Sequence, residues 1–480
     1  MVSFIYTAII SDLHLTDAEP PRHQVKSKHA LWKKFKTKEF YIDSALIQFL
    51  TFIQEEAATK PVELILNGDV FDFDSVMSLP VSAIYKINWL ETRRGLFPRQ
   101  EKSLFKIKII FEEHKAFVNA LRDFIHNGNK VVIIPGNHDV ELHFPEVQAY
   151  IREALALTED KQKNLVFTSW FYISNYDTLI EHGHQQDPYC LCENPLNPFL
   201  LDYNELSVRL PFGNVACRYM MNGLGLFNPH VEKNYIMSVP EYLRFFFKYL
   251  ITAQPLIMWT WLWGAIATLW HVVADRFATP YKGNISQESR VNHAAVQSQA
   301  TPAMVRQLQE LFVAPATNSP ILIAKELWLD RLFLILFAFL IIYYVMSILN
   351  NYLGLSLYWF FLPFSLFVPF FLFYARSVSS LVSEYKEPSE ALLSKQAEIT
   401  GVKRVVYGHT HVARHEFYGF VEHLNSGTWS PAFTNVECTE IFERNTYVWI
   451  TPVAADPGVR KAELLQFVVK NKTALALSDG

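Results

Sequence analysis

Cysteine is scarce in this chain of 480 residues, which contains only Cys190, Cys192, Cys217 and Cys438. Four cysteines form neither a dense disulfide framework nor a paired C-x-x-C zinc signature. In the stretch YCLCE, Cys190 and Cys192 could be reactive or metal-linked, but buried or incidental thiols explain them more simply. The scarcity excludes a disulfide-stapled secreted scaffold and agrees with a reducing compartment.

An excess of positive charge is also missing. The chain has 43 Lys and Arg residues against 47 Asp and Glu residues, a formal net charge of −4, and it has no basic tail. Because nucleic-acid-binding domains carry a basic patch or stripe, we expect no nucleic-acid partner. The N-terminal stretch MVSFIYTAIISDLHL lacks the charged region of a signal peptide, so we expect a first β-strand there.

Five short apolar runs each end at a polar cluster. They are FIYTAII before SDLHL, VELIL before NGDVFDF, KVVII before PGNHD, DTLI before EHGHQ, and KRVVY before GHTH. Such runs are typical of buried strands. Helical patterns lie between them. One pattern places Leu46, Phe49, Leu50 and Ile53 on one face, and another stops at Asn127-Gly128. The alternation predicts an α/β fold, in which ligands bind beyond the carboxyl ends of the strands.

The polar clusters contain carboxylate, imidazole and amide side chains. This ligand set favours Mn, Fe or Zn and disfavours a thiolate site. GHTH alone is equally compatible with a histidine-bearing turn, so the other clusters have to supply further ligands. Two metal ions that share one carboxylate can neutralise both sides of a phosphoryl group during its transfer. The candidate ligands are Asp12, His14, Asp69, Asn137, His182, His409 and His411.

Read in order, the clusters resemble a known family. DLH, GDVFD, GNHD, HGH and GHTH are similar to the five ordered motifs of the calcineurin-like metallophosphoesterases, over roughly residues 4–190 and 400–450. The resemblance implies a two-sheet sandwich flanked by helices, two divalent metal ions and a phosphate-ester substrate. It also implies an assignment: Asp12, His14 and His411 for one metal, Asn137, His182 and His409 for the other, and Asp69 as the bridge.

The same resemblance assigns catalytic roles around GNHD. His138 would contact the phosphate and protonate or stabilise the leaving oxygen, and a neighbouring carboxylate, Asp139, would keep the protonated form available near neutral pH. The alternative for His138 is a structural histidine. Asp72 would orient its neighbours without binding metal. His184 would either contact the substrate or stay exposed and idle.

Two departures limit the choice of relatives. After Asp72 the chain continues FDS, where protein serine/threonine phosphatases carry Arg-Gly, and their third motif ends in Glu in place of Asp139. These differences disfavour a phosphoprotein phosphatase. The bacterial hydrolases of UDP-diacylglucosamine, a lipid pyrophosphate, have a similar DLHL opening but usually an arginine where this chain has His138. The similarity is distant, and the substrate does not transfer with it.

Long uncharged runs interrupt the chain between the fourth and fifth motifs. Leu332–Leu349 would span about 27 Å as a helix, Leu353–Ala375 is longer, and both qualify as membrane helices joined by the turn NNY. A buried hairpin in a soluble core is the alternative. Basic residues flank both ends, which predicts a hairpin with both ends in the cytoplasm, and two prolines predict a bent second helix. The basic residues are Lys325, Arg331, Arg376 and Lys386, and the prolines are Pro363 and Pro369.

A third apolar run, Pro255–Ala274, is rich in tryptophan. If it also crossed the membrane, His182 and His409 would lie on opposite sides and could not share a site. We therefore expect this run at the membrane interface or packed on the hairpin. The polar stretch 276–320 is expected to be a linker or a loosely packed helix.

These observations predict three segments. Residues 1–200 and 396–470 would form the metallophosphoesterase core, and residues 201–395 a helical insertion with a membrane hairpin at 331–376. The predicted function is hydrolysis of a phosphomonoester, phosphodiester or pyrophosphate at a membrane, with a lipid-linked substrate favoured and the catalytic domain facing the cytoplasm. The alternatives are a hydrolase of soluble nucleotides or phosphoproteins that is membrane-bound for location only, and a non-catalytic scaffold. A scaffold would lack ligands, and none is missing here.

Overall fold

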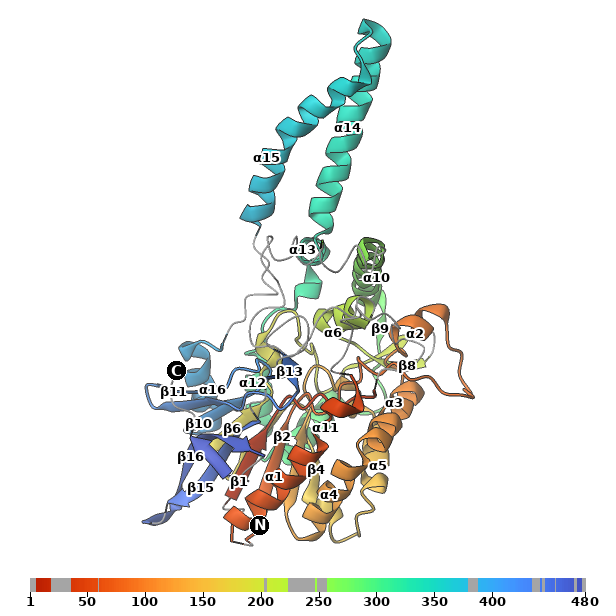
Figure 1. Cartoon of the computed structure of the whole chain (residues 1–480). Coiled ribbons are helices and arrows are strands. Elements are labelled where there is room, and N and C mark those ends of the chain that lie inside the picture. Colours follow the sequence, from red (N-terminus) through yellow and green to blue (C-terminus); the bar gives the residue numbers. More distant parts are fainter. Residues whose placement is uncertain are drawn as a thin grey trace.

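Two β-sheets packed face to face form the centre of the computed structural model (Figure 1). The structure describes residues 6–18, 36–58, 60–202, 205–222, 247, 257–378, 387–433, 441–442, 445–453, 455–469 and 473–476. The first sheet contains, in spatial order, β17 (Thr473–Ala476), β16 (Asp456–Val468), β15 (Thr446–Val453), β1 (Tyr6–Ile10), β2 (Val62–Asn67), β3 (Lys130–Ile134) and β4 (Leu165–Phe167). The second contains β11 (Arg414–Tyr418), β12 (Val421–Asn425), β10 (Arg404–Tyr407), β6 (Thr178–Glu181) and β5 (Phe171–Ser174).

The strands that lead to the polar clusters run parallel to one another. β1, β2, β3 and β4 are parallel neighbours in the first sheet, and β6, β10 and β12 are parallel neighbours in the second. The other strands extend both sheets with antiparallel pairing. Because the carboxyl ends of parallel strands share one edge, the polar clusters are brought to the same end of the sandwich.

Side chains that alternate along each strand separate the core into three layers. Ile9, Val132 and Val406 lie between the two sheets, whereas Ala8 and Val131 face the helices outside the first sheet. The outer face of the first sheet is covered by α1 (Asp43–Glu56), α3 (Gln100–Glu113), α4 (Lys115–His126) and α5 (Pro145–Ala154). The expected α/β sandwich flanked by helices is confirmed.

The polar stretch 276–320 is neither a linker nor loosely packed. It contains α11 (Gln287–Gln297) and α12 (Pro302–Gln309), which cover the second sheet together with α16 (Glu390–Thr400). Val291, Ala295, Val305 and Leu308 are buried in that layer. The prediction was wrong because a few apolar residues at helical spacing are enough to build a buried stripe in a mostly polar segment.

The remaining described elements join these layers. They are the helices α2 (Trp89–Arg94), α6 (Phe212–Ala216), α10 (Ile257–Phe277) and α13 (Pro320–Glu326), the π-helix η5 (Cys217–Met221), the strands β7 (Phe199–Asp202), β8 (Glu205–Val208), β9 (Thr279–Pro280), β13 (Ala432–Phe433) and β14 (Ile441–Phe442), and the 3-10 turns η1 (Lys38–Phe40), η2 (Val140–His143), η3 (Gln162–Asn164), η4 (His184–Gln186) and η7 (Ala316–Asn318). Three predicted positions, Pro255, Lys386 and Cys438, lie outside the described residues.

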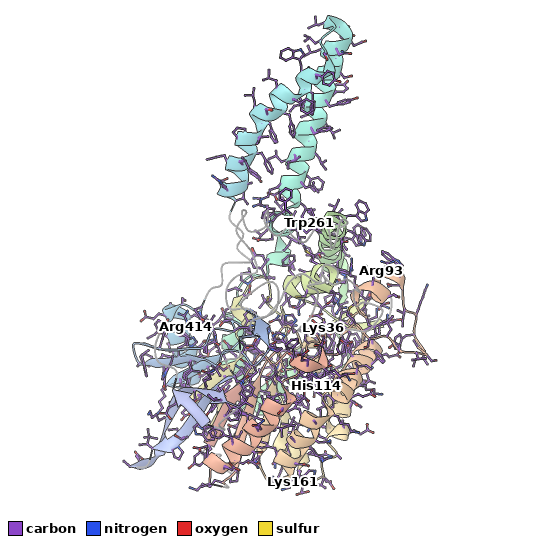
Figure 2. The ribbon with its side chains drawn as sticks, viewed as in Figure 1. Lys36, Arg93, His114, Lys161, Trp261 and Arg414 are labelled. Carbon is purple, nitrogen blue, oxygen red and sulfur yellow. The ribbon has the colours of Figure 1, made fainter. Side chains whose placement is uncertain are left out.

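Two long apolar helices, α14 (Leu329–Leu353) and α15 (Phe361–Ser377), protrude from the body of the protein (Figure 1). Their side chains project outward along the whole protrusion (Figure 2). The spans Leu329–Leu353 and Tyr358–Ser377, which contain α14 and α15, are long and apolar enough to cross a membrane, and only 6% and 0% of their most apolar windows are buried. This exposure disagrees with the alternative of a hairpin buried in a soluble core.

The chain reverses later in the sequence than predicted. Asn350 and Asn351 are still helical, and α14 ends at Leu353, followed by the capping residue Gly354, whose φ of 67° is left-handed. The chain then passes through η8 (Leu357–Phe360) into α15. Glycine ends the helix because it adopts this conformation without steric cost. Pro369 lies inside α15.

Polar contacts close the base of the protrusion. The Arg331 side chain donates to the carbonyl oxygens of Lys325 at 2.9 Å and Val378 at 2.8 Å, which lie before α14 and after α15. The Tyr374 hydroxyl donates to Asp330 at 2.9 Å. The two helices are therefore tied together where they leave the body.

The tryptophan-rich run forms α10, which packs on the body. Its buried face, which includes Ala265, Thr268 and Val272, lies against α6, η5 and α13. Trp259 and Trp270 are exposed on its other face. α10 therefore connects the base of the hairpin to the α6–η5 segment.

Candidate metal centre

The predicted ligands meet where the two sheets converge. Asp12 and Asp69 follow β1 and β2 in the first sheet, and His182 and His409 follow β6 and β10 in the second. The Asp12 amide donates to the carbonyl of Gly68 at 3.1 Å, and the Gly408 amide donates to the carbonyl of His182 at 3.0 Å. These bonds hold neighbouring strand ends in register.

One group of ligand atoms comes from Asp12, His14 and His411, which lie within 4.8 Å of one another. Nε2 of His411 is 3.1 Å from Oδ1 of Asp12 and 3.4 Å from Nε2 of His14. Two imidazole nitrogens and a carboxylate oxygen thus converge on one point. Burial lowers the pKa of His14 to about 4, so this imidazole is neutral at pH 7, as a metal ligand must be.

A second group comes from Asp69, His182 and His409. Nε2 of His182 lies 3.3 Å from Oδ2 of Asp69, and its Nδ1 donates to the carbonyl of Asn67 at 2.8 Å. Because that bond places the proton on Nδ1, it leaves Nε2 directed at the carboxylate. Oδ2 of Asp69 is also 3.8 Å from Nε2 of His14, so Asp69 lies between the two groups.

The buried polar atoms of these groups fit divalent cations. Buried polar atoms normally have hydrogen-bond partners. Among the predicted ligands in the described part of the chain, the atoms without such a partner include Asp12 Oδ1, Asn137 Oδ1, His182 Nε2 and His409 Nδ1. All four are oxygen or imidazole nitrogen atoms, which are ligands that Mn, Fe and Zn accept. Asn137 stands between Gly136 and His138, and the backbone of His138 donates to Asp69 at 2.8 Å.

The charges around Asp69 indicate where a cation would act. Burial opposes the charged forms, but His182 lowers the pKa of Asp69 well below its usual value, and Asp69 and Asp12 raise the pKa of His182 to about 9. A proton on His182 therefore balances the two carboxylates. A divalent cation would take over this balance and release the proton.

The backbone at the ligands is strained. Left-handed φ angles occur at Asp12 (55°), His14 (47°), Asp69 (49°), His409 (70°) and His411 (59°). Such a conformation costs about 1–3 kcal/mol at a residue other than glycine and clusters at functional sites. Five of the seven predicted ligands carry this cost, which the surrounding packing has to offset.

His138 lies at the edge of the two groups. Its Nδ1 is 3.4 Å from Oδ1 of Asp72 and 3.6 Å from Oδ2 of Asp74, and its ring centroid is 5.0 Å from that of His14. Burial disfavours its charged form, but Asp69 and Asp72 raise the pKa of His138 well above its usual value. The imidazole can therefore carry a proton beside the candidate metal ligands at neutral pH.

Asp139 does not lie beside the imidazole of His138. It is fully buried, and its carboxylate accepts hydrogen bonds from the amides of Val70, at 2.9 Å, and Gly136. Burial and the charge of Asp69 raise the pKa of Asp139 to about 7. Its carboxylate joins two turns, whereas the carboxylates that lie near Nδ1 of His138 are those of Asp72 and Asp74. Sequence adjacency misled because side chains of consecutive residues point in different directions.

His184 is also buried, which excludes the exposed, idle alternative. Its ring lies 5.4 Å from that of His182 and 6.4 Å from that of His409, measured between centroids. Burial lowers its pKa well below the usual value, so it is neutral. His184 therefore packs against the second ligand group.

Residues 5–210 match the family model of the calcineurin-like phosphoesterases. The chain carries a calcineurin-like phosphoesterase domain. Members of this family are metal-dependent phosphoric ester hydrolases with a dinuclear site of divalent metals. The matched residues hold the first four motifs, and GHTH, at 408–411, reaches the same site from beyond the match. No curated protein matches the chain.

Several residues of the candidate metal centre were missed by sequence reasoning. Asp187 lies 3.1 Å from Nε2 of His409, so it orients that ring and leaves Nδ1 facing the ligand group. Asp187, Cys190 and His409 also have their ligand atoms within 4.8 Å of one another. Asp74 and Arg218 lie behind His138. The repeated aspartates of GDVFDFD were a signal for Asp74, but nothing in the sequence links it to Arg218.

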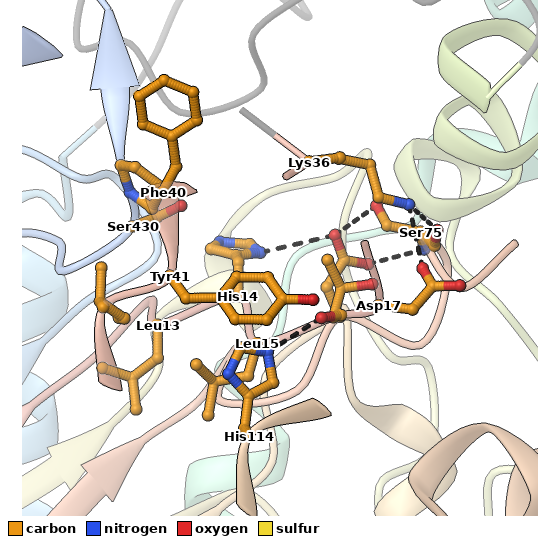
Figure 3. A pocket seen from close by; sticks show the side chains of 14 residues that line it. Leu13, His14, Leu15, Asp17, Lys36, Phe40, Tyr41, Ser75, His114 and Ser430 are labelled. Atoms are coloured by element: carbon orange, nitrogen blue, oxygen red, sulfur yellow. Dashed lines mark hydrogen bonds and ion pairs between the residues drawn. The ribbon is translucent and has the colours of Figure 1, made fainter. Parts of the chain in front are cut away.

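A pocket opens beside the first ligand group of the candidate metal centre (Figure 3). His14 and Asp72 form the wall shared with the site, and Tyr41 and Phe40 supply aromatic surface. Nζ of Lys36 lies 3.2 Å from Asp17 at the other side. The other lining residues are Leu13, Leu15, Thr16, Asp17, Ile42, Ser75, His114, Ser430 and Pro431.

Proposed function

We propose that this chain is a membrane-attached dinuclear metallophosphoesterase that cleaves a phosphomonoester, phosphodiester or pyrophosphate bond in a lipid-linked or membrane-proximal substrate. The observation that carries the phosphoesterase part is the convergence of two ligand groups on Asp69, with His138 at their edge. The exposed apolar protrusion supports the membrane part.

The assignment of ligands follows the two groups. Asp12, His14 and His411 would hold one divalent cation, and His182 and His409 would hold the other. Asn137, whose buried Oδ1 has no hydrogen-bond partner, would join the second set, and Asp69 would contact both cations. Cations bound there would activate a water molecule for attack and offset the charge of the phosphoryl group. Mn, Fe and Zn suit this donor set.

His138 would protonate the leaving oxygen. Its Nδ1 faces the carboxylates of Asp72 and Asp74, which leaves the proton on Nε2 for the substrate. The two carboxylates also keep the imidazolium form populated until the transfer. After the transfer the neutral imidazole recovers a proton from solvent, because 15% of its side chain is exposed.

The protrusion would cross the membrane as a hairpin. A helix of 25 residues such as α14 is about 37 Å long, more than the roughly 30 Å hydrocarbon core of a bilayer. Lys325, Arg331 and Arg376 stand at the two ends, which favours a cytoplasmic base. The catalytic domain would then face the cytoplasm, with residues 201–395 inserted between its two parts, 1–200 and 396–470.

Turnover measurements on the purified full chain test this proposal. Apoprotein is reloaded with Mn, Fe or Zn in turn and assayed against soluble aryl phosphate mono- and diesters, nucleotides, and phospholipids and nucleotide-lipids in vesicles. We expect metal-dependent cleavage, with a preference for a lipid substrate over its short-chain soluble analogue. A protein that binds no transition metal would contradict the phosphoesterase part, and equal cleavage of soluble and embedded analogues would contradict the lipid part alone.

A further inference from the structure

One face of the α6–η5 segment is turned toward the loops that carry His138. Asn214, Arg218 and Asn222 are spaced four residues apart, so they lie on the same side of this helical segment. All three contact Asp74. The segment belongs to the insertion, far in sequence from GNHD.

The contacts fix both the carboxylate and the backbone of Asp74. The Asn214 side chain donates to Oδ2 of Asp74 at 2.5 Å and to the carbonyl of Asn137 at 2.7 Å. Arg218 donates to Oδ1 of Asp74 at 2.9 Å, and Asn222 donates to its carbonyl at 2.7 Å. The same Oδ2 lies 3.6 Å from Nδ1 of His138.

The burial of these polar and charged side chains is not explained by a gain in stability. Asn214 is 0% exposed, and Asp74 and Arg218 are each 2% exposed. Arg218 also lies 4.0 Å from Glu141, which pairs with buried Lys106 at 3.1 Å. Buried ion pairs add little net stability compared with apolar residues of the same volume. The π-helical turn of η5 is a further departure from regular structure that is frequent at functional sites.

The segment is held from behind by α10. A Cβ added at Gly264 would lie 2.9 Å from the carbonyl oxygen of Tyr219, so the two backbones approach closely. The Tyr219 hydroxyl also lies 3.1 Å from Nδ1 of His271 on α10. The segment is therefore confined between α10 and the catalytic loops.

We propose that Asn214 and Arg218 are positioning residues that hold the Asp74 carboxylate against His138, so that the insertion completes the active site. This inference rests on the proposed phosphoesterase function. Asp74 and Asp72 together fix the ring of His138 from its Nδ1 side and leave Nε2–H directed at the leaving oxygen. Without Arg218, Asp74 would lose its charge partner, and the imidazole ring of His138 would lose its orientation.

A leaving-group comparison separates positioning from general support of the fold. Arg218→Met is assayed on a nitrophenyl phosphate ester, whose leaving group departs without a proton, and on the matching alkyl ester, whose leaving group needs one. General acid catalysis contributes about 10²–10⁴-fold, so we expect the alkyl-to-nitrophenyl ratio of kcat/KM to fall by roughly 10-fold or more. Bound metal should stay at the wild-type amount, and Arg218→Lys should restore part of the ratio.

Arg404→Met is the matched control, because Arg404 is also 2% exposed and pairs with Glu422 at 2.7 Å, at the start of β10. It should lower thermal stability and leave the ratio unchanged. If Arg218→Met does not fold, the isosteric Asp74→Asn takes its place with the same expected fall in the ratio. The positioning role alone would be overturned if Arg218→Met kept both its metal and the wild-type ratio of kcat/KM. It would also be overturned if Arg404→Met changed the ratio equally. No turnover by the wild-type protein on any ester would overturn the phosphoesterase proposal as well.

Discussion

Substitution of Gly68 by alanine should damage the metal centre through a single methyl group. Gly68 has a φ of +80°, and a Cβ built there would lie 2.3 Å from Nδ1 and 2.4 Å from Cγ of His182. Ordinary contacts begin near 3.4 Å, so the ring has to move by about 1 Å. The hydrogen bond from Nδ1 to the carbonyl of Asn67, now 2.8 Å long, would then break.

The energetic cost has two parts. Forcing alanine into the left-handed region costs about 1–2 kcal/mol. Overpacking a buried contact adds about 1–3 kcal/mol. A displacement of about 1 Å at a reacting centre can lower the rate by about 10²-fold. We therefore expect Gly68→Ala to fold with reduced stability, to bind metal more weakly and to lose about two orders of magnitude in turnover.

Gly128→Ala is the matched control. Gly128 has a similar φ of +94°, but a Cβ there would meet nothing within 4 Å. Its free energy of unfolding should fall by the same cost of placing alanine in the left-handed region, about 1–2 kcal/mol. Its metal binding and turnover should stay at the wild-type level. Thermal unfolding, metal content by elemental analysis and kcat/KM on an aryl phosphate ester are measured for both variants. The reasoning is refuted if Gly68→Ala differs from Gly128→Ala in none of the three.

Three further predictions concern the site and the protrusion. Asp69→Asn should abolish metal-dependent turnover, because the charge of Asp69 serves both ligand groups. The control Asp177→Asn, remote from these groups, should keep its turnover. Wild-type turnover by Asp69→Asn would count against the shared site. His138→Ala should keep its metal and slow turnover by about 10²–10⁴-fold, and loss of metal would make His138 a ligand instead. Replacing residues 332–373 by a flexible linker keeps Arg331 and should release the protein from membranes with soluble aryl ester cleavage intact. Persistent membrane binding would place the anchor elsewhere.

Local sequence patterns were sufficient for much of the fold. The helix from Asp43 buries Leu46, Phe49, Leu50 and Ile53 as predicted, because these residues repeat with the period of an α-helix. The five polar clusters follow buried strands as expected, and parallel pairing brings them together. The chain reversal was misplaced, since asparagine is tolerated in a long apolar helix and the left-handed Gly354 ends it.

The sequence by itself determined which atoms could bind a metal and where the apolar hairpin lies, because residue type, motif order and hydrophobic length are properties of short stretches. The tertiary structure decided which groups surround His138. Asp139, its neighbour in sequence, turns to the backbone, whereas Asp74 and the distant Arg218 meet behind the ring. These contacts depend on how α6 and η5 pack between α10 and the sheets, and no local periodicity encodes such a long-range arrangement.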